Sequence, residues 1–131
     1  LGIIGTGRIG LAMIKKCSSF DMNMLCYDPA YHNDNYIASI QELMDLRHAK
    51  GIQKEKTWIK YVEFEEALRG GDYVSIHVPL LREGETDKPT YHLINEKTLK
   101  LMKPMAYLIN SSRGPVVDAR PRRFPAVGRA G

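Results

Sequence analysis

Three glycines near the amino terminus have the spacing of a turn that cradles an anion. They lie in Gly5-Thr-Gly-Arg-Ile-Gly10, directly after the apolar run at residues 1–4. Gly5 permits a tight turn, Gly7 removes the side chain that would keep a pyrophosphate from the backbone, and Gly10 lets a helix pack closely on a strand. A helix that begins here offers free N–H groups and a partial positive charge to the phosphates. The pattern predicts a dinucleotide site.

An aspartate follows at the distance expected of a ribose ligand. Asp28 lies 18 residues after Gly10, at the end of a second apolar run at residues 22–27. A carboxylate in this place accepts hydrogen bonds from both hydroxyls of the adenosine ribose and repels a 2′-phosphate, which favours NAD over NADP. Two alternatives remain open from these residues alone: a glycine turn without a ligand and an aspartate that caps a loop, or a nucleoside cofactor such as S-adenosylmethionine.

The elements that must position these residues alternate in type. Helical character is expected at residues 8–19, 37–47, 64–68 and 96–102, between apolar runs that read as strands at residues 1–4, 22–27, 58–62, 73–78 and 106–109. In the first helix, Ile9, Met13, Cys17 and Phe20 recur every three or four residues and predict its buried face. Asn95 is expected to cap the last helix. The alternation predicts an α/β fold with a doubly wound parallel sheet of about five strands.

The remaining stretch between the second and third strands is harder to interpret. Residues 31–57 combine a polar segment, a helical segment and a lysine-rich loop, and we expect them to form a surface excursion. His32 and His48 lie in this excursion and are expected to be solvated. The loop at residues 80–90 is charged and long for its place between a strand and a helix.

Composition restricts the class of protein. The 131 residues suit one domain, and 44% hydrophobic with 26% charged residues is typical of a soluble globular domain. No apolar run approaches the ~20 residues needed to span a bilayer. Cys17 and Cys26 are too few for a disulfide framework, so we expect buried thiols in a reducing compartment. No residue spacing predicts a metal site.

The net charge of +4 belongs to the end of the chain. Positions 1–118 hold 15 basic and 15 acidic residues, and the excess comes from Arg120, Arg122, Arg123 and Arg129. We expect residues 119–131 to be an unstructured tail rich in Arg, Pro and Gly. A run of arginines is weak support for nucleic-acid binding, so no nucleic-acid partner is expected.

Further motifs extend the pattern to residue 118. They are YVSIHVPL at 73–80, HLIN at 92–95 and MKPMAYLINSSRGPVVD at 102–118. With the glycine turn and Asp28, they resemble the D-isomer-specific 2-hydroxyacid dehydrogenases. Within that family, KTWIK at 56–60, FEEAL at 64–68 and TYHL at 90–93 look most like glycerate dehydrogenases, also called hydroxypyruvate reductases. The resemblance implies a Rossmann-type NAD-binding domain over residues 1–118, with the family's separate substrate domain absent.

The resemblance also assigns roles to single residues. Arg8 and Ile9 match residues that lie on the pyrophosphate. Val78 and Pro79, at the end of the fourth strand, match positions that line the cofactor cleft. Ser111, Ser112 and Arg113 match a segment that touches the nicotinamide side. His77 ends a strand, and we expect it to be a packed histidine beside the cleft. None of the four histidines matches the family's proton-transferring histidine.

Arg113 matches the family's catalytic arginine. A fixed guanidinium can pair with the carboxylate of a 2-oxo acid or polarise its carbonyl, and so stabilise the negative charge that develops as hydride arrives. The alternative is a structural arginine that ties its loop to a neighbouring carboxylate such as Asp118. A catalytic role is favoured, because a charge at the end of a central strand lies where function usually does.

The resemblance also implies a function for the parent enzyme, the full-length dehydrogenase of which this chain would be the NAD-binding domain. The parent enzyme would transfer hydride between NADH and a small 2-oxo acid such as hydroxypyruvate or glyoxylate, giving D-glycerate or glycolate. Without the proton-transferring histidine, this chain is expected to bind NAD(H) weakly and not to turn over. The parent is expected to be an intracellular homodimer, cytoplasmic or peroxisomal, with no membrane partner. The alternative is a non-catalytic NAD-sensing protein that resembles the C-terminal-binding corepressors, whose partner groove would lie in the absent domain.

Overall fold

Five parallel strands form one sheet in the computed structural model, which describes residues 1–82, 84, 86, 87 and 89–118. The strand order is β3-β2-β1-β4-β5. The strands are β1 (Gly2–Ile4), β2 (Met24–Tyr27), β3 (Ile59–Tyr61), β4 (Tyr73–Ile76) and β5 (Tyr107–Asn110). β1 lies at the centre, where Gly2 is paired with Leu25 on one side and with Val74 on the other. From β1 the chain adds β2 and β3 on one side and then returns to add β4 and β5 on the other side of β1. The strand order therefore reverses between β1 and β4.

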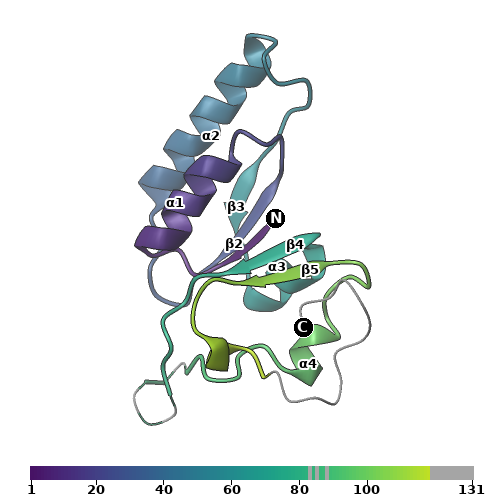
Figure 1. Cartoon of the computed structure of the whole chain (residues 1–131). Helices are drawn as coiled ribbons and strands as arrows, with labels where there is room; N and C mark the ends of the chain where they lie inside the picture. The colour runs from purple at the N-terminus through teal and green to yellow at the C-terminus, as the bar shows by residue number, and fades with distance from the viewer. Residues whose placement is uncertain (83, 85, 88, 119–131) are drawn as a thin grey trace.

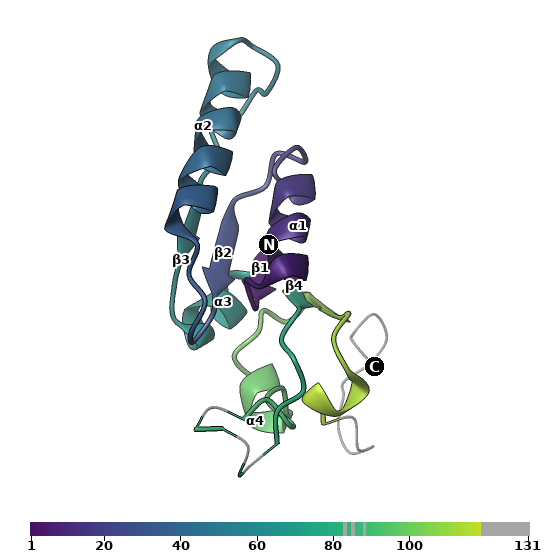
Figure 2. The same ribbon diagram turned by 90° about the vertical axis from the view of Figure 1, so that its left-hand side faces the viewer.

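Helices lie on both faces of this sheet (Figure 1). They are α1 (Arg8–Cys17), α2 (Asp34–Ala49), α3 (Phe64–Gly70) and α4 (Glu96–Leu99), with a short 3₁₀ helix, η1 (Gly114–Val116). α1 and α2 cover one face of β1 to β3, and α3 lies on the other face (Figure 2). This arrangement confirms the predicted Rossmann-type α/β fold.

Two hydrophobic clusters hold the layers together. Neighbouring residues of a strand face opposite sides, so Ile3 enters the cluster under α1 and α2 while Ile4 enters the cluster under α3. The first cluster also includes Ile14, Met24, Cys26, Ile37, Ile40, Met44 and Ile59. The second also includes Leu25, Ala67, Leu68, Val74, Ile76, Val78, Ile94 and Val116.

The buried face of α1 differs from the prediction. Ile9 and Phe20, which were expected to be buried, are 65% and 67% exposed, whereas Ile14 is fully buried. The cause is Gly10, where a Cβ would lie 1.9 Å from the carbonyl oxygen of Gly5. The helix approaches the sheet most closely at this glycine, and Ile14, one turn later on the same side, enters the core.

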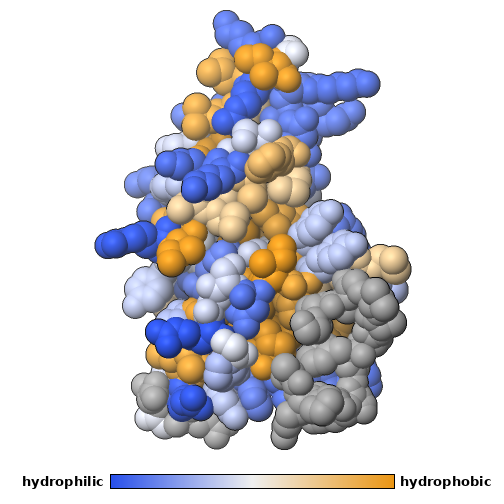
Figure 3. Space-filling view, in the orientation of Figure 1, coloured by the Kyte–Doolittle hydropathy of each residue, from blue (hydrophilic) through white to orange (hydrophobic). Residues whose placement is uncertain are grey.

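α2 is also more than a surface excursion. The helix is longer than predicted, is capped by the Asn33 side chain, which accepts from Tyr36 N at 3.1 Å, and buries Ile37, Ile40 and Met44 against the sheet. Its outer side nevertheless exposes leucines, so hydrophobic and hydrophilic residues are interspersed over α2 in Figure 3. Apolar residues on both sides of the helix obscure its period in the sequence.

Near the end of the described chain, the prediction for Asn95 is confirmed. Its side chain accepts from the backbone N–H of Lys97 and of Thr98, while Asn95 N donates to Thr98 Oγ1 at 2.8 Å. The helix ends at Leu99, earlier than predicted. Predictions that concern Glu83, Glu85, Lys88 and residues 119–131 lie outside the described residues. Within the described part, no helix has the length and apolar character to cross a membrane.

Candidate functional site

The glycine turn packs closely between the ends of β2 and β4. Gly5 adopts a φ of 102°, which side-chain-bearing residues rarely adopt, and its N–H donates to Tyr27 O at 2.7 Å. A Cβ at Gly5 would lie 2.8 Å from the carbonyl carbon of His77, at the end of β4. The turn therefore requires glycine at position 5 for its backbone conformation and at position 10 for close packing, as the sequence predicts.

The start of α1 is open to an anion. Gly7 is the N-cap residue, no side chain caps the helix, and the first turn contains no acidic residue. A Cβ at Gly7 would meet nothing within 4 Å, and Arg8 and Ile9 are exposed. Free N–H groups at a helix start, next to open space and without a competing carboxylate, fit a bound phosphate group.

Asp28 is tied to the glycine turn. The carboxylate is buried, Oδ2 accepts from Thr6 N at 2.8 Å, and Oδ1 accepts from the backbone N–H of Ala30 and Tyr31 at 2.8 and 2.7 Å. Each carboxylate oxygen can accept two hydrogen bonds, so Oδ2 retains room for one further donor, whereas the sequence predicts bonds from both ribose hydroxyls. The bonds from the backbone orient the carboxylate beside the turn, where a ribose hydroxyl would be the additional donor.

The ends of β4 and β5 contact each other next to the turn. The Ser112 hydroxyl donates to Val78 O, and Ser112 N donates to Asn110 Oδ1 at 3.0 Å. Asn110 Nδ2 donates to Arg113 O at 3.0 Å. Val78 is buried, whereas Pro79 and Ser111 are exposed. The loop that carries Arg113 is thus held against the end of β4.

The Arg113 side chain is exposed, and within the described part of the chain its guanidinium makes no hydrogen bond or ion pair. Asp118, the carboxylate of the structural alternative, instead lies beside His92, with 3.8 Å between Nδ1 and Oδ2. The guanidinium is therefore available to an incoming anion.

His77 is packed beside the glycine turn. It is half-buried, and its Nε2 lies 2.8 Å from Ser75 Oγ. Its Nδ1 is buried and has no hydrogen-bond partner among the described residues. Burial lowers the pKa of His77 and favours the neutral ring. Across the described residues, no group of three or more His, Cys, Asp or Glu side chains is placed to hold a metal ion.

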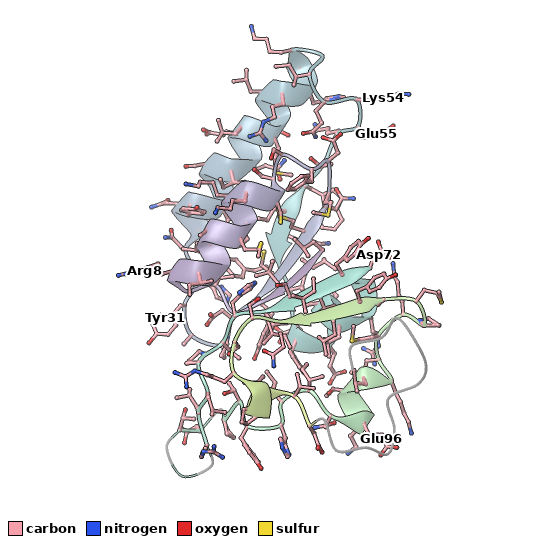
Figure 4. The ribbon with its side chains drawn as sticks, in the orientation of Figure 1. Arg8, Tyr31, Lys54, Glu55, Asp72 and Glu96 are labelled. Atoms are coloured by element: carbon pink, nitrogen blue, oxygen red, sulfur yellow. The ribbon has the colours of Figure 1, made fainter. Side chains whose placement is uncertain are left out.

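All the predicted site residues lie at the carboxyl ends of β1, β2, β4 and β5. In Figure 4, Arg8 and Tyr31 lie near this end, whereas Lys54 and Glu55 lie at the far end of α2. Ligands of open α/β sheets bind beyond the carboxyl ends of strands, where the strand order reverses. The arrangement can hold an elongated anion from Asp28, across the glycine turn, to the Arg113 loop.

The sequence prediction assigned no role at this site to four residues of the region, which are Thr6, Tyr31, His32 and Tyr61. Thr6 is 2% exposed, and its hydroxyl donates to Tyr31 O and accepts from Tyr61 OH. His32, which was expected to be solvated, is exposed but stacks on the Tyr61 ring. Thr6 and Tyr61 are 55 positions apart. Thr6 is a variable position of the glycine motif and Tyr61 belongs to no motif, so the sequence contains no signal that pairs them.

Comparison with known families places this geometry in context. The family model described as "D-isomer specific 2-hydroxyacid dehydrogenase, NAD binding domain" matches residues 1–121. A glyoxylate reductase of Thermococcus litoralis is 42% identical over 118 residues, which cover 90% of this chain and 28% of the relative. A peroxisomal glycerate dehydrogenase of Arabidopsis thaliana is 39% identical over 119 residues, which cover 90% of this chain and 29% of the relative.

Solved structures give the same family. A D-isomer-specific 2-hydroxyacid dehydrogenase from Lactobacillus delbrueckii ssp. bulgaricus, complexed with NAD, has a TM-score of 0.66 and 33% identity, and the match covers 89% of this chain and 28% of that one. A D-lactate dehydrogenase from Aquifex aeolicus, complexed with NAD and lactic acid, has a TM-score of 0.65 and 36% identity with the same coverage. The chain spans less than a third of the length of these relatives.

Proposed function

Because this chain belongs to the D-isomer-specific 2-hydroxyacid dehydrogenases and matches their NAD-binding domain, we propose that it binds NAD(H) at the carboxyl ends of its strands. The pyrophosphate lies on the glycine turn and the start of α1, and the adenosine ribose lies on Asp28. Val78 and Pro79 line the cleft, and residues 111–113 lie on the nicotinamide side. The NAD-binding domain comprises residues 1–118.

One observation supports this proposal most strongly. Thr6, in the middle of the glycine turn, donates its backbone N–H to the carboxylate of Asp28 at 2.8 Å. This bond holds the phosphate-binding turn beside the ribose-binding acid, as two contacts with the same dinucleotide require.

In a full-length dehydrogenase that contains this domain, the bound cofactor exchanges hydride with a small 2-oxo acid, such as hydroxypyruvate or glyoxylate. Bound NADH supplies the hydride. Arg113 pairs with the carboxylate or carbonyl of the substrate and stabilises the charge that develops on its oxygen. The names of the relatives, glyoxylate reductase and glycerate dehydrogenase, support substrates of this size. The compartment is the cytoplasm or the peroxisome.

The 131-residue chain alone binds the cofactor without turnover, because no residue at the described site offers a general acid beside Arg113. His77, the nearby histidine at the end of β4, is half-buried and its pKa is lowered. Incubation of the purified chain with NADH and hydroxypyruvate should therefore leave the NADH absorbance unchanged. Measurable oxidation of NADH would contradict this part of the proposal.

Arg113→Gln, made in a full-length dehydrogenase that contains this domain, tests the catalytic step. The change removes the charge but keeps a hydrogen-bonding side chain, so we expect kcat to fall on the order of 10²–10³-fold while NADH affinity is nearly unchanged. Steady-state kinetics and an NADH titration measure the two quantities. An equal loss of turnover and of cofactor affinity would instead indicate a structural arginine.

A further inference from the structure

We propose that Tyr61, the last residue of β3, is a positioning residue for the cofactor site. Its hydroxyl holds Thr6, and through Thr6 it holds both the glycine turn and the loop after β2 in the geometry that binds NAD(H). This inference rests on the function proposed above and extends it to a strand that contributes no residue to the predicted site.

Thr6 joins three segments of the chain. Tyr61 OH donates to Thr6 Oγ1 at 2.9 Å, and Thr6 Oγ1 donates to Tyr31 O at 2.6 Å. Thr6 N donates to Asp28 Oδ2 at 2.8 Å. Since Thr6 is 2% exposed, water does not easily replace a lost partner, and each of these bonds is costly to break.

The Tyr61 hydroxyl is itself held in place. The imidazole of His32 is stacked on the Tyr61 ring, with the ring centroids 3.9 Å apart and the planes 3° from parallel. His32 Nε2 lies 2.8 Å from Asp28 O, an acceptor, so it is this nitrogen that donates. Asn33 N donates to Tyr61 OH at 3.0 Å, which leaves the hydroxyl proton directed to Thr6. The ring and its hydroxyl therefore have one arrangement.

This network couples β3 to both contacts with the dinucleotide. Thr6 lies between Gly5 and Gly7, so a shift of Thr6 moves the backbone that approaches the pyrophosphate. The same shift moves the carboxylate of Asp28, which accepts from Thr6 N. Loss of the Tyr61 hydroxyl should therefore weaken NADH binding and also reduce discrimination against NADPH, because both depend on the position of Asp28.

Tyr61→Phe in the 131-residue chain tests the proposal. The change keeps the ring and its stack on His32 but removes the bond to Thr6 and the acceptor of Asn33 N. We expect the Kd for NADH, measured by fluorescence titration, to rise about threefold to tenfold, with a smaller change for NADPH. Tyr36→Phe is the matched control, since Tyr36 OH donates at 3.0 Å to Leu11 O in α1, outside this network. Both affinities should be unchanged in this control.

A double-mutant cycle separates positioning from general stability. If Tyr61 acts through Thr6, Tyr61→Phe should have almost no further effect on NADH affinity in a Thr6→Ala background. Additive effects, or an unchanged Kd in Tyr61→Phe, would overturn the proposal. If Tyr61→Phe fails to fold by circular dichroism, Thr6→Ser and Thr6→Ala take its place: Ser should bind NADH like the wild type and Ala more weakly, and equal affinities of the two variants would overturn the proposal.

Titrations of the wild type and of Tyr61→Phe also separate the role of Tyr61 from the proposed function. A wild-type chain that is folded but binds no NADH overturns the proposed function, and this proposal with it. A wild-type chain that binds NADH, together with a Tyr61→Phe variant that binds and discriminates equally well, overturns the role of Tyr61 alone.

Discussion

Burial changes the chemistry of single side chains in this sheet, and Cys26 is the clearest example. The thiol is fully buried in the central part of the sheet, and desolvation raises its pKa from 9.0 to about 12. The half-buried Cys17 thiol also has a raised pKa, for the same reason. Both side chains therefore pack as neutral groups, and neither is activated as a nucleophile at neutral pH.

The raised pKa of Cys26 predicts a pH dependence of stability. The unfolded chain releases the thiol proton near pH 9, whereas the folded chain holds it to about pH 12. Stability from this group is therefore complete below pH 9 and is lost between pH 9 and 12, by up to about 1.4 kcal/mol per pH unit. Denaturant unfolding over this range should show a smaller decline in Cys26→Ala than in the wild type. Parallel declines in the two proteins would refute this assignment.

Elements were easier to predict than their faces. The strands and the helix after the glycine turn have strong local signals, and the order of motifs along the chain places the site at the strand ends. The buried face of α1 could not be predicted, because it depends on how closely Gly10 approaches Gly5, a contact across two elements. The Tyr61–Thr6 bond was missed for the same reason, since its partners are distant in sequence.

Gly10→Ala tests the packing of α1 on β1. Its Cβ would lie 1.9 Å from Gly5 O, a backbone atom, so the helix must move. We expect the free energy of unfolding, measured in urea, to fall by about 2–3 kcal/mol. Gly7→Ala is the matched control, because a Cβ at Gly7 meets nothing within 4 Å. It should leave stability nearly unchanged but impair NADH binding. Equal stability of the two variants would contradict the described packing.

Across the whole molecule, the site is assembled by topology and local charge. Positions 1–118 hold equal numbers of acidic and basic residues, so net charge does not draw the dinucleotide to this part of the chain. We propose that attraction comes from the uncapped start of α1 and from Arg8 and Arg113, which are exposed. We propose that selectivity comes from Asp28. The reversal of strand order between β1 and β4 brings these residues to one end of the sheet.

We propose that this end of the sheet binds NAD(H) and that Asp28 favours it over NADP(H). The most direct measurement is a titration of the folded 131-residue chain, and of its Asp28→Ala variant, with NADH and with NADPH. We expect the wild type to bind NADH more tightly than NADPH. The variant should lose about tenfold or more in NADH affinity and bind the two cofactors almost equally. A folded wild-type chain that binds no NADH would contradict binding at this end of the sheet, and a variant with unchanged selectivity would contradict the role of Asp28.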